Sequence, residues 1–547
     1  MSRKSYVWFF VAAVMVQLLG MLMIDLMEHD ATQYATIAMQ MIRDGSWLQV
    51  FWRDVSYLDK PPLVFWTSSV SYMLFGVNHF AYRLPSYLVL LLGVYSTFRL
   101  ARQFYGMPES VLAALVLITS QGIFLISHDV RTDTMLMGWV TFSLWQFSEF
   151  FDRRKWPAFF WAFTGVGLAM LTKGPLGLMI PILSFGPYIL LRKKWKDMIQ
   201  PYYLLGLAWV VVVLSPMLVG LWQQHGFEGI GFYFWKQSFG RITGENVWRD
   251  DSGPLFFVHS FAWAFLPWTL PAIFGIYLMT VKVLRRPAAN DSFILWGAIL
   301  VFVAMSFATY KLPHYIFVVF PLFAIMAAMG IMGISRMNLR MWIWGQWLTL
   351  FLISSGMIFL TIVDFSVVSL FVLLASVSVI TLSVRYLKST SDWGVHRVFV
   401  FSYVVIVGAN AMLHLDFYPK LLQYQSGSVA GSLVKQQGVS EENVCFFVQH
   451  SPSFDFYAQM TPPYYRTLSQ LDSVLRQREK ITVFTNETGY NMLTDAGYTI
   501  SELKQFREFK ATKLSFQFII PDSRNRVVSK NYLVSVGNKM SKAQTVE

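Results

Sequence analysis

This sequence predicts a polytopic α-helical membrane protein with a C-terminal α/β domain, and three observations support that fold class. Hydrophobic residues make up 55% of the 547 residues and charged residues only 14%, with a mean hydropathy of +0.47. That composition excludes an ordinary water-soluble protein. About thirteen apolar stretches are long enough to cross a bilayer. Hydropathy then falls past residue 414, which predicts a transmembrane domain over 1–414 and a separate domain over 415–547.

The predicted spans follow one another along the first domain. They are approximately 6–27, 83–101, 111–127, 133–152, 156–172, 174–191, 203–222, 263–283, 292–309, 314–333, 341–363, 365–384 and 396–414. The first stretch follows Met-Ser-Arg-Lys and superficially resembles a secretory signal. No small-residue cleavage site follows it, and its length of about 20 residues suffices to span, so we predict a retained helix.

The basic residues give this topology a direction. With a cytoplasmic N-terminus, the inside segments carry nineteen Lys and Arg residues, whereas the short outside loops carry only Arg131, Lys173 and Lys311. Positive charges mark the cytoplasmic side, and an odd number of spans places the last domain outside. The formal charge of +13 therefore reflects topology and contact with anionic lipids, and we expect no nucleic-acid partner.

Two outside loops, 28–82 and 223–262, are too long to be simple connectors. Within the first, Thr36–Ile42 and Phe65–Phe75 are predicted as short helices lying on the membrane. In the last domain we predict strands at 444–448, 480–485 and 515–520 and helices at 469–479 and 487–495. The single cysteine, Cys445, excludes an internal disulfide and a cysteine-based metal cluster.

Charged residues in the first outside loop are the first candidates for chemistry. Asp30, in the run Glu28-His29-Asp30, stands where a carboxylate can act as a general base. Because Asp30 also precedes a predicted helix, an N-cap is the alternative role. Lys60 follows Asp59 and precedes two prolines, and it suits contact with a phosphate; a lysine touching lipid headgroups is the competing interpretation.

The next two candidates lie in short outside loops. Asp129, Arg131 and Asp133 form a polar group between two apolar spans, and mutual ion pairing is a structural explanation for them. Asp133 lies at the mouth of a span, where it can face the same outer cavity as Asp30. Lys173 stands in a tight turn before Gly174 and Pro175, a pair that turns use for conformational reasons as well.

The fifth candidate combines two outside segments, Arg241–Arg249 and Tyr310–Tyr315. Both place cations beside aromatic residues, as an anionic and partly apolar ligand requires. An aromatic belt at the membrane interface is the alternative explanation. The predicted topology puts all five candidates on one face, and this grouping predicts an anionic, lipid-linked substrate.

The order of these motifs resembles a known family. An acid after the first span is followed by Asp-Lys-Pro-Pro-Leu, Arg-Thr-Asp-Thr-Met-Leu, Leu-Thr-Lys-Gly-Pro and Lys-Leu-Pro-His-Tyr. The series resembles the polyprenyl-phosphate-sugar glycosyltransferases of the GT-C superfamily. Within it the chain is most similar to the bacterial lipid A aminoarabinose transferase, which in turn resembles protein O-mannosyltransferases. The motifs lie within residues 1–330.

The resemblance implies a role for each candidate. Asp30 and Asp133 match the catalytic acids. The residues implied in binding the donor phosphate are Lys60, Lys173, Arg241 and Arg249. Those implied in lining the cavity are Glu28, Tyr34, Asp59, Lys311, His314 and Tyr315. Where the family commonly has Asp-Glu-x-Arg-Tyr, this chain has Asp30-Ala31-Thr32-Gln33-Tyr34, so a second acid and an arginine are missing. Glu28 is a candidate to replace the missing acid. Because of these departures, the sugar or the acceptor can differ from aminoarabinose and lipid A.

The function implied is inverting transfer of a sugar from an undecaprenyl-phosphate donor to an acceptor outside the cytoplasm. The implied location of the chain is the inner membrane of a bacterium, which it crosses several times. Lipid A is the expected acceptor, and a protein is the alternative. No cofactor is required by these residues; a divalent metal stays open, although no Asp-x-Asp motif is evident. A lipid or solute transporter is the competing class, but the predicted spans carry few charges at mid-membrane and show no repeat.

Overall fold

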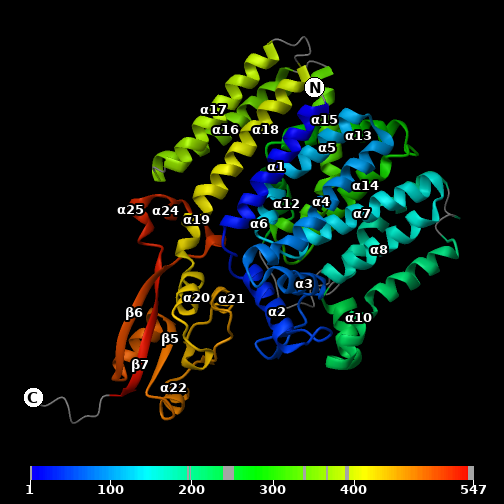
Figure 1. The fold of residues 1–547 in the computed structure, drawn as a ribbon. Coiled ribbons are helices and arrows are strands. Elements are labelled where there is room, and N and C mark those ends of the chain that lie inside the picture. Colours follow the sequence, from blue (N-terminus) through cyan, green and yellow to red (C-terminus); the bar gives the residue numbers. More distant parts are fainter. Residues whose placement is uncertain are drawn as a thin grey trace, which may run out of the picture.

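The computed structural model describes residues 3–193, 196, 199–237, 252–336, 340–364, 367–388 and 394–539. A helical bundle occupies most of this chain, and a smaller part built on a β-sheet hangs from one end of it (Figure 1). The bundle helices up to residue 231 are α1 (Arg3–Met23), α4 (His79–Phe104), α5 (Met107–Thr119), α6 (Gln121–His128), α7 (Thr132–Arg153), α8 (Trp156–Lys173), α9 (Leu176–Leu191) and α10 (Tyr202–Gly231). The later ones are η2 (Phe232–Lys236), α12 (Phe256–Ala264), α13 (Thr269–Arg285), α14 (Ser292–Ser306), η3 (Pro313–Val319), α15 (Phe320–Arg336), α16 (Arg340–Asp364), α17 (Val367–Lys388) and α18 (Gly394–Met412).

Each of the thirteen apolar stretches coincides with one of these helices or with a consecutive pair. Six helices among the described residues are long and apolar enough to cross a membrane, and eight candidates result if each bent pair counts as one span. The pairs are α5–α6, bent by 55°, and α12–α13, bent by 117°. The structure therefore confirms a mostly helical chain with apolar helices of spanning length, while the number of spans remains a prediction.

The first long outside loop folds into two helices and a hairpin. These are α2 (Asp30–Asp44), β1 (Phe51–Trp52), β2 (Val55–Ser56) and α3 (Leu63–Phe75). Both predicted short helices exist, but α2 does not lie on the membrane surface. Residues 31–41 of α2 are buried, because the helix packs between α3 and the C-terminal part of the chain. Val70 and Leu74 of α3 remain exposed, as expected of a helix at the membrane interface.

The C-terminal part is organised around a five-stranded sheet in the order β4-β3-β5-β7-β6. Its strands are β3 (Val444–Phe447), β4 (Tyr464–Tyr465), β5 (Lys480–Asn486), β6 (Tyr498–Glu508) and β7 (Ser529–Lys539). Strand β3 pairs in parallel with β4 and β5, whereas β7 pairs antiparallel with β5 and β6. The helical segments around the sheet are η4 (Leu413–Phe417), α19 (Tyr418–Leu421), η5 (Leu422–Tyr424), α20 (Ser426–Gln436), η6 (Glu441–Asn443), α21 (Pro452–Ala458), α22 (Leu468–Leu475), α23 (Glu487–Asp495), η7 (Ala511–Lys513), α24 (Phe516–Ile519) and α25 (Pro521–Arg524).

Of the three predicted strands, 444–448 and 480–485 correspond to β3 and β5, but 515–520 is wrong. That segment contains the single helical turn α24. The Ser515 side chain accepts a hydrogen bond from Phe518 N and caps the turn, and Pro521 follows it. Caps of this kind favour a helix start over an extended strand. The predicted helices 469–479 and 487–495 correspond to α22 and α23.

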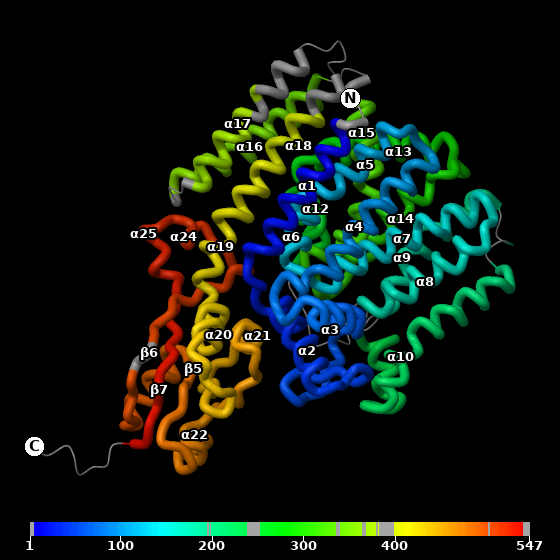
Figure 2. The backbone as a smooth tube through the Cα atoms, in the orientation of Figure 1, coloured from blue at the N-terminus to red at the C-terminus, as the bar shows by residue number. Residues whose placement is uncertain are grey.

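A continuous helical run attaches the C-terminal part to the bundle. Helix α18 continues through η4 and α19, and it lies beside α1 (Figure 2). His414 Nδ1 lies 2.8 Å from Val16 O, which fastens the run to α1. The predicted domain boundary at residue 414 falls inside this run, and the sheet-containing part begins with α20.

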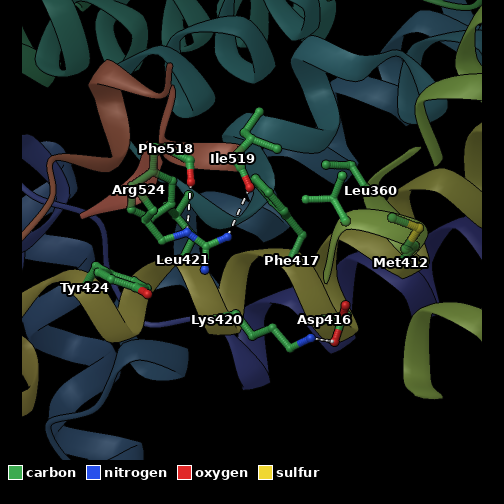
Figure 3. A pocket seen from close by; sticks show the side chains of 11 residues that line it. Leu360, Met412, Asp416, Phe417, Lys420, Leu421, Tyr424, Phe518, Ile519 and Arg524 are labelled. Atoms are coloured by element: carbon green, nitrogen blue, oxygen red, sulfur yellow. Dashed lines mark hydrogen bonds and ion pairs between the residues drawn. The ribbon is translucent and has the colours of Figure 1, made fainter. Parts of the chain in front are cut away.

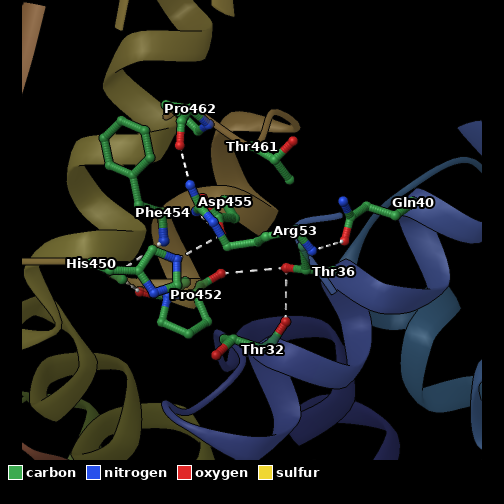
Figure 4. A network of polar contacts seen from close by, with 12 residues as sticks. Thr32, Thr36, Gln40, Arg53, His450, Pro452, Phe454, Asp455, Thr461 and Pro462 are labelled. Carbon is green, nitrogen blue, oxygen red and sulfur yellow. Dashed lines mark hydrogen bonds and ion pairs between the residues drawn. The ribbon is translucent and has the colours of Figure 1, made fainter. Parts of the chain in front are cut away.

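A salt bridge joins the C-terminal part to the β1–β2 hairpin (Figure 4). Arg53 Nη1 donates to both carboxylate oxygens of Asp455, at 2.9 and 2.7 Å, and Nη2 donates to Pro462 O. The Asp455 side chain is fully buried and also meets His450 Nε2 at 2.9 Å. Arg53 and Asp54 both have positive φ, a backbone that a two-residue hairpin turn requires and that glycine or asparagine adopts more readily. The contacts with Asp455 and Pro462 thus hold the hairpin in a conformation that its own residues disfavour.

Arg83 fixes the end of the bundle from which the first outside loop departs. Its side chain is fully buried, and it donates hydrogen bonds to the carbonyl oxygens of Met21, Ile24, Asp25 and His128 at 2.5–2.9 Å. These carbonyls stand at or near the C-terminal ends of α1 and α6, where backbone acceptors lack helical partners. Arg83 therefore sets the starting points of both segments that carry the acids Asp30 and Asp129.

We expect Arg83→Met to lower the stability of the protein by about 2 kcal/mol, because several buried carbonyls would lose their donor. Thermal unfolding of the purified protein in detergent measures the change. Arg99→Met is the matched control, since Arg99 lies on the same helix with its side chain 38% exposed. An unchanged unfolding temperature for Arg83→Met would contradict this role.

Candidate active site

Polar side chains from five separate segments converge at one end of the bundle. They come from the start of α2, the segment that leads into α3, the start of α7, the α8–α9 turn and the start of η3. Helices α4 and α7 cross closely enough that a Cβ on Gly138 would lie 2.2 Å from Val89 O. Only glycine permits this approach, and the crossing sets the position of the α7 N-terminus.

Asp30 and Arg131 form the centre of the first group. Arg131 Nη1 lies 3.0 Å from Asp30 Oδ2, and Arg131 Nε lies 3.1 Å from Asp129 Oδ2. Burial alone would lower the pKa of the Arg131 guanidinium, but Asp129 and Asp30 raise it above its usual value, so Arg131 is a permanent cation. Asp30 is the first residue of α2, whose cap, His29, makes no side-chain capping bond. Asp30 thus pairs with Arg131 instead of capping the helix, and 39% of its side chain remains exposed.

Asp133 and Lys173 form the second group. Lys173 Nζ lies 2.5 Å from Asp133 Oδ1, and His314 Nε2 lies 3.6 Å from Asp133 Oδ2. The Lys173 ammonium also lies 4.2 Å from the centre of the Tyr315 ring. The Asp133 side chain is 3% exposed, in the first turn of α7, where the helix dipole favours an anion. Four of the predicted site residues are therefore in direct contact.

Two phenols connect the first group to Asp59 and Lys60. Lys60 Nζ pairs with Asp59 Oδ2, and Tyr57 shares a side-chain hydrogen bond with Tyr34. Burial raises the pKa of both phenols, and the negative charges of Asp30 and Asp59 raise it further. Both tyrosines therefore remain protonated at neutral pH and can donate hydrogen bonds.

The two groups form one electrostatic unit. His314 interacts with Lys60 and Arg131 as well as with Asp133 and Lys173, and Arg131 interacts with Asp133. The resulting cluster contains Asp30, Asp59, Lys60, Arg131, Asp133, Lys173 and His314. A small pocket adjoins it, between Lys60 and helix α10, with Tyr57, Pro62, Gln224 and Tyr233 in its walls.

The remaining predicted site residues have other surroundings. Lys311 is 8% exposed, and its Nζ donates to Ser252 O at 2.9 Å, at the end of the second long loop. Glu28 is set apart from the cluster, because its Oε1 accepts hydrogen bonds from Ser453 N and Oγ, at 3.0 and 2.6 Å, and from Ser451 Oγ. Its carboxylate therefore faces the C-terminal part of the chain. Arg241 and Arg249 lie outside the described residues.

Glu28 lies near a second partly buried carboxyl, Glu508 of β6. Burial and the negative charge of Glu28 raise the pKa of Glu508 from 4.5 to about 7, although hydrogen bonds from Ser426 act in the opposite direction. Ser426 N donates to Glu508 Oε2 at 2.9 Å, and Asn531 Nδ2 lies 3.4 Å from the same oxygen. Glu508 therefore takes up a proton in the folded protein more readily than in the unfolded chain.

This raised pKa predicts a stability that depends on pH. The proton on Glu508 stabilises the fold below about pH 4.5, and the stabilisation, at most about 3 kcal/mol, is lost as the pH rises through about 7. Unfolding temperatures measured from pH 5 to pH 8 should fall more steeply for the wild type than for Glu508→Gln. The exposed Glu479 provides the control, since Glu479→Gln should keep the wild-type slope; equal slopes in all three proteins would contradict the assignment.

Several site residues were not singled out from the sequence. Tyr57 was not among the predicted site residues, and Arg83 entered only as the first residue of the predicted span 83–101. A fully buried arginine at the end of an apolar span is itself a signal, since such a residue requires several acceptors. Among the described residues, no group of three or more His, Cys, Asp or Glu side chains is placed to hold a metal ion.

Comparison with known proteins shows which fold the chain has. A family model described as dolichyl-phosphate-mannose-protein mannosyltransferase matches residues 59–220, a segment that holds Lys60, Asp133 and Lys173. A solved structure of ArnT from Cupriavidus metallidurans, bound to undecaprenyl phosphate, superposes with a TM-score of 0.78 over 98% of both chains, at 19% sequence identity. The chain has the ArnT fold. The apo form of the same Cupriavidus metallidurans protein superposes with a TM-score of 0.76 over 97% of both chains.

Curated relatives are similar to the chain in sequence. Undecaprenyl phosphate-alpha-4-amino-4-deoxy-L-arabinose arabinosyl transferase of Edwardsiella ictaluri is 26% identical over 341 residues, 58% of each chain. The protein of the same name from Pseudomonas aeruginosa is 29% identical over 295 residues, 52% of each chain. The chain thus spans about half to three-fifths of the length of the curated relatives it matches. These matches confirm the resemblance to polyprenyl-phosphate-sugar glycosyltransferases of the aminoarabinose transferase type.

Proposed function

We propose that this chain is an inner-membrane glycosyltransferase that moves a sugar from an undecaprenyl-phosphate-linked donor to lipid A on the outer side of the membrane. The convergence of Asp30 and Asp133 with Lys60, Lys173 and Arg131 at one end of the bundle carries this proposal. Two carboxylates among three cations suit a reaction that releases a phosphate. The names of the similar curated proteins and the undecaprenyl phosphate bound to ArnT support the choice of donor.

In the proposed reaction an acceptor oxygen attacks the anomeric carbon of the sugar from the face opposite the lipid phosphate. A bond from the acceptor oxygen to that carbon forms, the bond from the carbon to the phosphate oxygen breaks, and undecaprenyl phosphate leaves with the electron pair. Lys60 and Lys173 stabilise the charge that develops on the phosphate, because fixed cations in a site shielded from water act strongly on such charge.

Asp30 serves as base or positioning group for the acceptor. A hydroxyl acceptor gives its proton to Asp30 as it attacks, whereas a phosphate acceptor is already anionic and needs no base. Arg131 orients Asp30 through the contact at 3.0 Å. Asp133, paired with Lys173 and His314, holds the ammonium group in place next to the donor. No step in this mechanism depends on a metal ion.

The membrane topology belongs to the same proposal. Thirteen spans, with the basic loops on the cytoplasmic side, put the cluster and the C-terminal part on the periplasmic side. Undecaprenyl-linked sugars in the outer leaflet would reach the site from that side. A cysteine placed at the exposed position Lys480 should react with a membrane-impermeant maleimide in intact spheroplasts if this orientation holds. A cysteine at Arg102, in the last turn of α4 and on the predicted cytoplasmic side, should react only after the membrane is permeabilised.

The acceptor is tested in a strain that lacks this gene. Mass spectrometry of lipid A should show loss of one sugar-modified species, restored by the wild-type gene, while glycosylation of secreted proteins stays unchanged. Loss of sugar from a secreted protein with intact lipid A would replace the acceptor by a protein, the second candidate. Unchanged lipid A and unchanged secreted proteins would contradict the proposed function and return a transporter to consideration.

A further inference from the structure

A second cavity lies on the side of the molecule where α24 and α25 meet the ends of α16 and α18 (Figure 3). None of the cluster residues around Asp30 lines it. Apolar side chains from both parts of the chain form most of its wall. The charged residues in the wall are Asp416, Lys420 and Arg524.

Arg524 is held rigidly at this cavity. Its Nε donates to Phe518 O at 2.9 Å and its Nη2 donates to Ile519 O at 3.1 Å. The guanidinium carbon also lies 5.2 Å from the centre of the Phe518 ring and 5.9 Å from that of Tyr424. A guanidinium has five N–H donors, and Nη1 has no hydrogen-bond partner within the described part of the chain. An oriented cation with remaining donors suits a phosphate, which binds arginine through two oxygens.

The chain segment beside the cavity carries an excess of positive charge. Lys420 Nζ lies 2.9 Å from Asp416 Oδ1, so the charges of this pair cancel. The lysine side chain is still 40% exposed. The segment 510–526, which contains α24 and α25, carries four cations and a single acid, Asp522. Of these cations Lys510, Lys513 and Arg526 are exposed. Such an excess attracts an anionic surface.

Apolar side chains stand exposed next to the same cations. Phe516 of α24 is 65% exposed and stacks on Phe359 of α16, with ring centres 5.8 Å apart. Ile362, in the last turn of α16, is 70% exposed, and Leu514 is 42% exposed. Helix α16 is one of the six candidate membrane spans, so these side chains lie at the level where its apolar surface ends. Exposed apolar groups beside cations match the boundary between lipid chains and headgroups.

We propose that this cavity binds the phosphate of an anionic phospholipid, with Arg524 as the principal ligand and the lipid chains lying along α16 and Phe516. Binding fastens the sheet-containing part of the chain to the membrane surface. The headgroup contacts Arg524 and Lys420, and Phe516 enters the apolar layer beside Phe359. The site is separate from the cluster around Asp30 and does not depend on the proposed transfer reaction.

The test uses the full chain purified in a neutral detergent, titrated with phosphatidylglycerol, with phosphatidylcholine and with inorganic phosphate. Native mass spectrometry counts bound lipid, and thermal unfolding reports stabilisation. Phosphatidylglycerol should bind and raise the unfolding temperature, with little effect of the other two. Arg524→Gln should weaken phosphatidylglycerol binding about tenfold, as expected for loss of one charge-assisted contact. The exposed Arg476, at the end of α22, provides the control Arg476→Gln, which should bind like the wild type.

A second variant separates loss of binding from loss of folding, since Arg524 also holds two carbonyls of α24. Ile519→Trp keeps Arg524 but fills the cavity, and it should bind phosphatidylglycerol weakly while unfolding, without lipid, at the wild-type temperature. Unchanged binding by both variants would overturn the proposal. Equal binding of phosphatidylcholine would also overturn it, as would inorganic phosphate reproducing the full stabilisation, because the occupant would then be a free anion.

Discussion

Asp30→Asn is expected to reduce sugar transfer about 100- to 10,000-fold, the range over which a positioned general base contributes to catalysis. The asparagine has nearly the same shape but neither accepts a proton nor balances Arg131, which lies 3.0 Å away. The loss should be larger for a hydroxyl acceptor than for a phosphate acceptor, because only the hydroxyl must give up a proton. Proteoliposomes supplied with an undecaprenyl-phosphate sugar and each acceptor measure the rates.

Asp44→Asn is the matched control for this experiment. Asp44 ends the same helix, α2, and pairs with Arg43 at the surface with 37% of its side chain exposed. Its replacement removes one carboxylate from the same helix without touching the cluster, so transfer should continue at the wild-type rate. Full activity of Asp30→Asn would remove Asp30 from the mechanism.

Arg53→Met is expected to cost about 3 to 5 kcal/mol, the usual consequence of leaving a buried charge without its partner. The fully buried Asp455 would keep His450 but lose the guanidinium that contacts both its oxygens. The β1–β2 turn would also lose the contacts that hold Arg53 at positive φ. A large drop in unfolding temperature and faster proteolytic release of the C-terminal part are the expected readouts.

Arg43→Met separates this effect from any general loss of positive charge near the junction. Arg43 also reaches across to the C-terminal part, with Nη1 lying 3.7 Å from Glu441 Oε2, but its side chain is 42% exposed. Exposed ion pairs contribute at most about 1 kcal/mol, so this variant should unfold close to the wild-type temperature. Similar behaviour of the two variants would contradict a specific role for the Arg53–Asp455 bridge.

Hydropathy and short motifs predicted the helical bundle and most of the cluster. The apolar stretches coincide with helices because a lipid environment demands continuous apolar residues and internal hydrogen bonding. Asp133 and Lys173 stand 40 residues apart, yet both were assigned to one site, because the predicted topology placed their loops on one face. The 2.5 Å contact between them agrees with that assignment.

Contacts between the bundle and the C-terminal part were beyond prediction from the sequence. Glu28 faces Ser451 and Ser453, more than 420 residues later in the chain, and no local pattern announces such a contact. The same packing buries α2, whose sequence suggested a helix on the membrane surface. The apolar run at 515–520 suggested a strand, but a serine cap and the contacts of Arg524 with Phe518 and Ile519 stabilise a helical turn there.

The central claim is tested most directly by measuring both products of the reaction in proteoliposomes supplied with an undecaprenyl-phosphate sugar and lipid A. Wild-type protein should release undecaprenyl phosphate and form glycosylated lipid A in equal amounts, as determined by mass spectrometry. Donor consumption without glycosylated acceptor, or movement of the lipid across the membrane without any covalent product, would contradict the assignment of this cluster to glycosyl transfer.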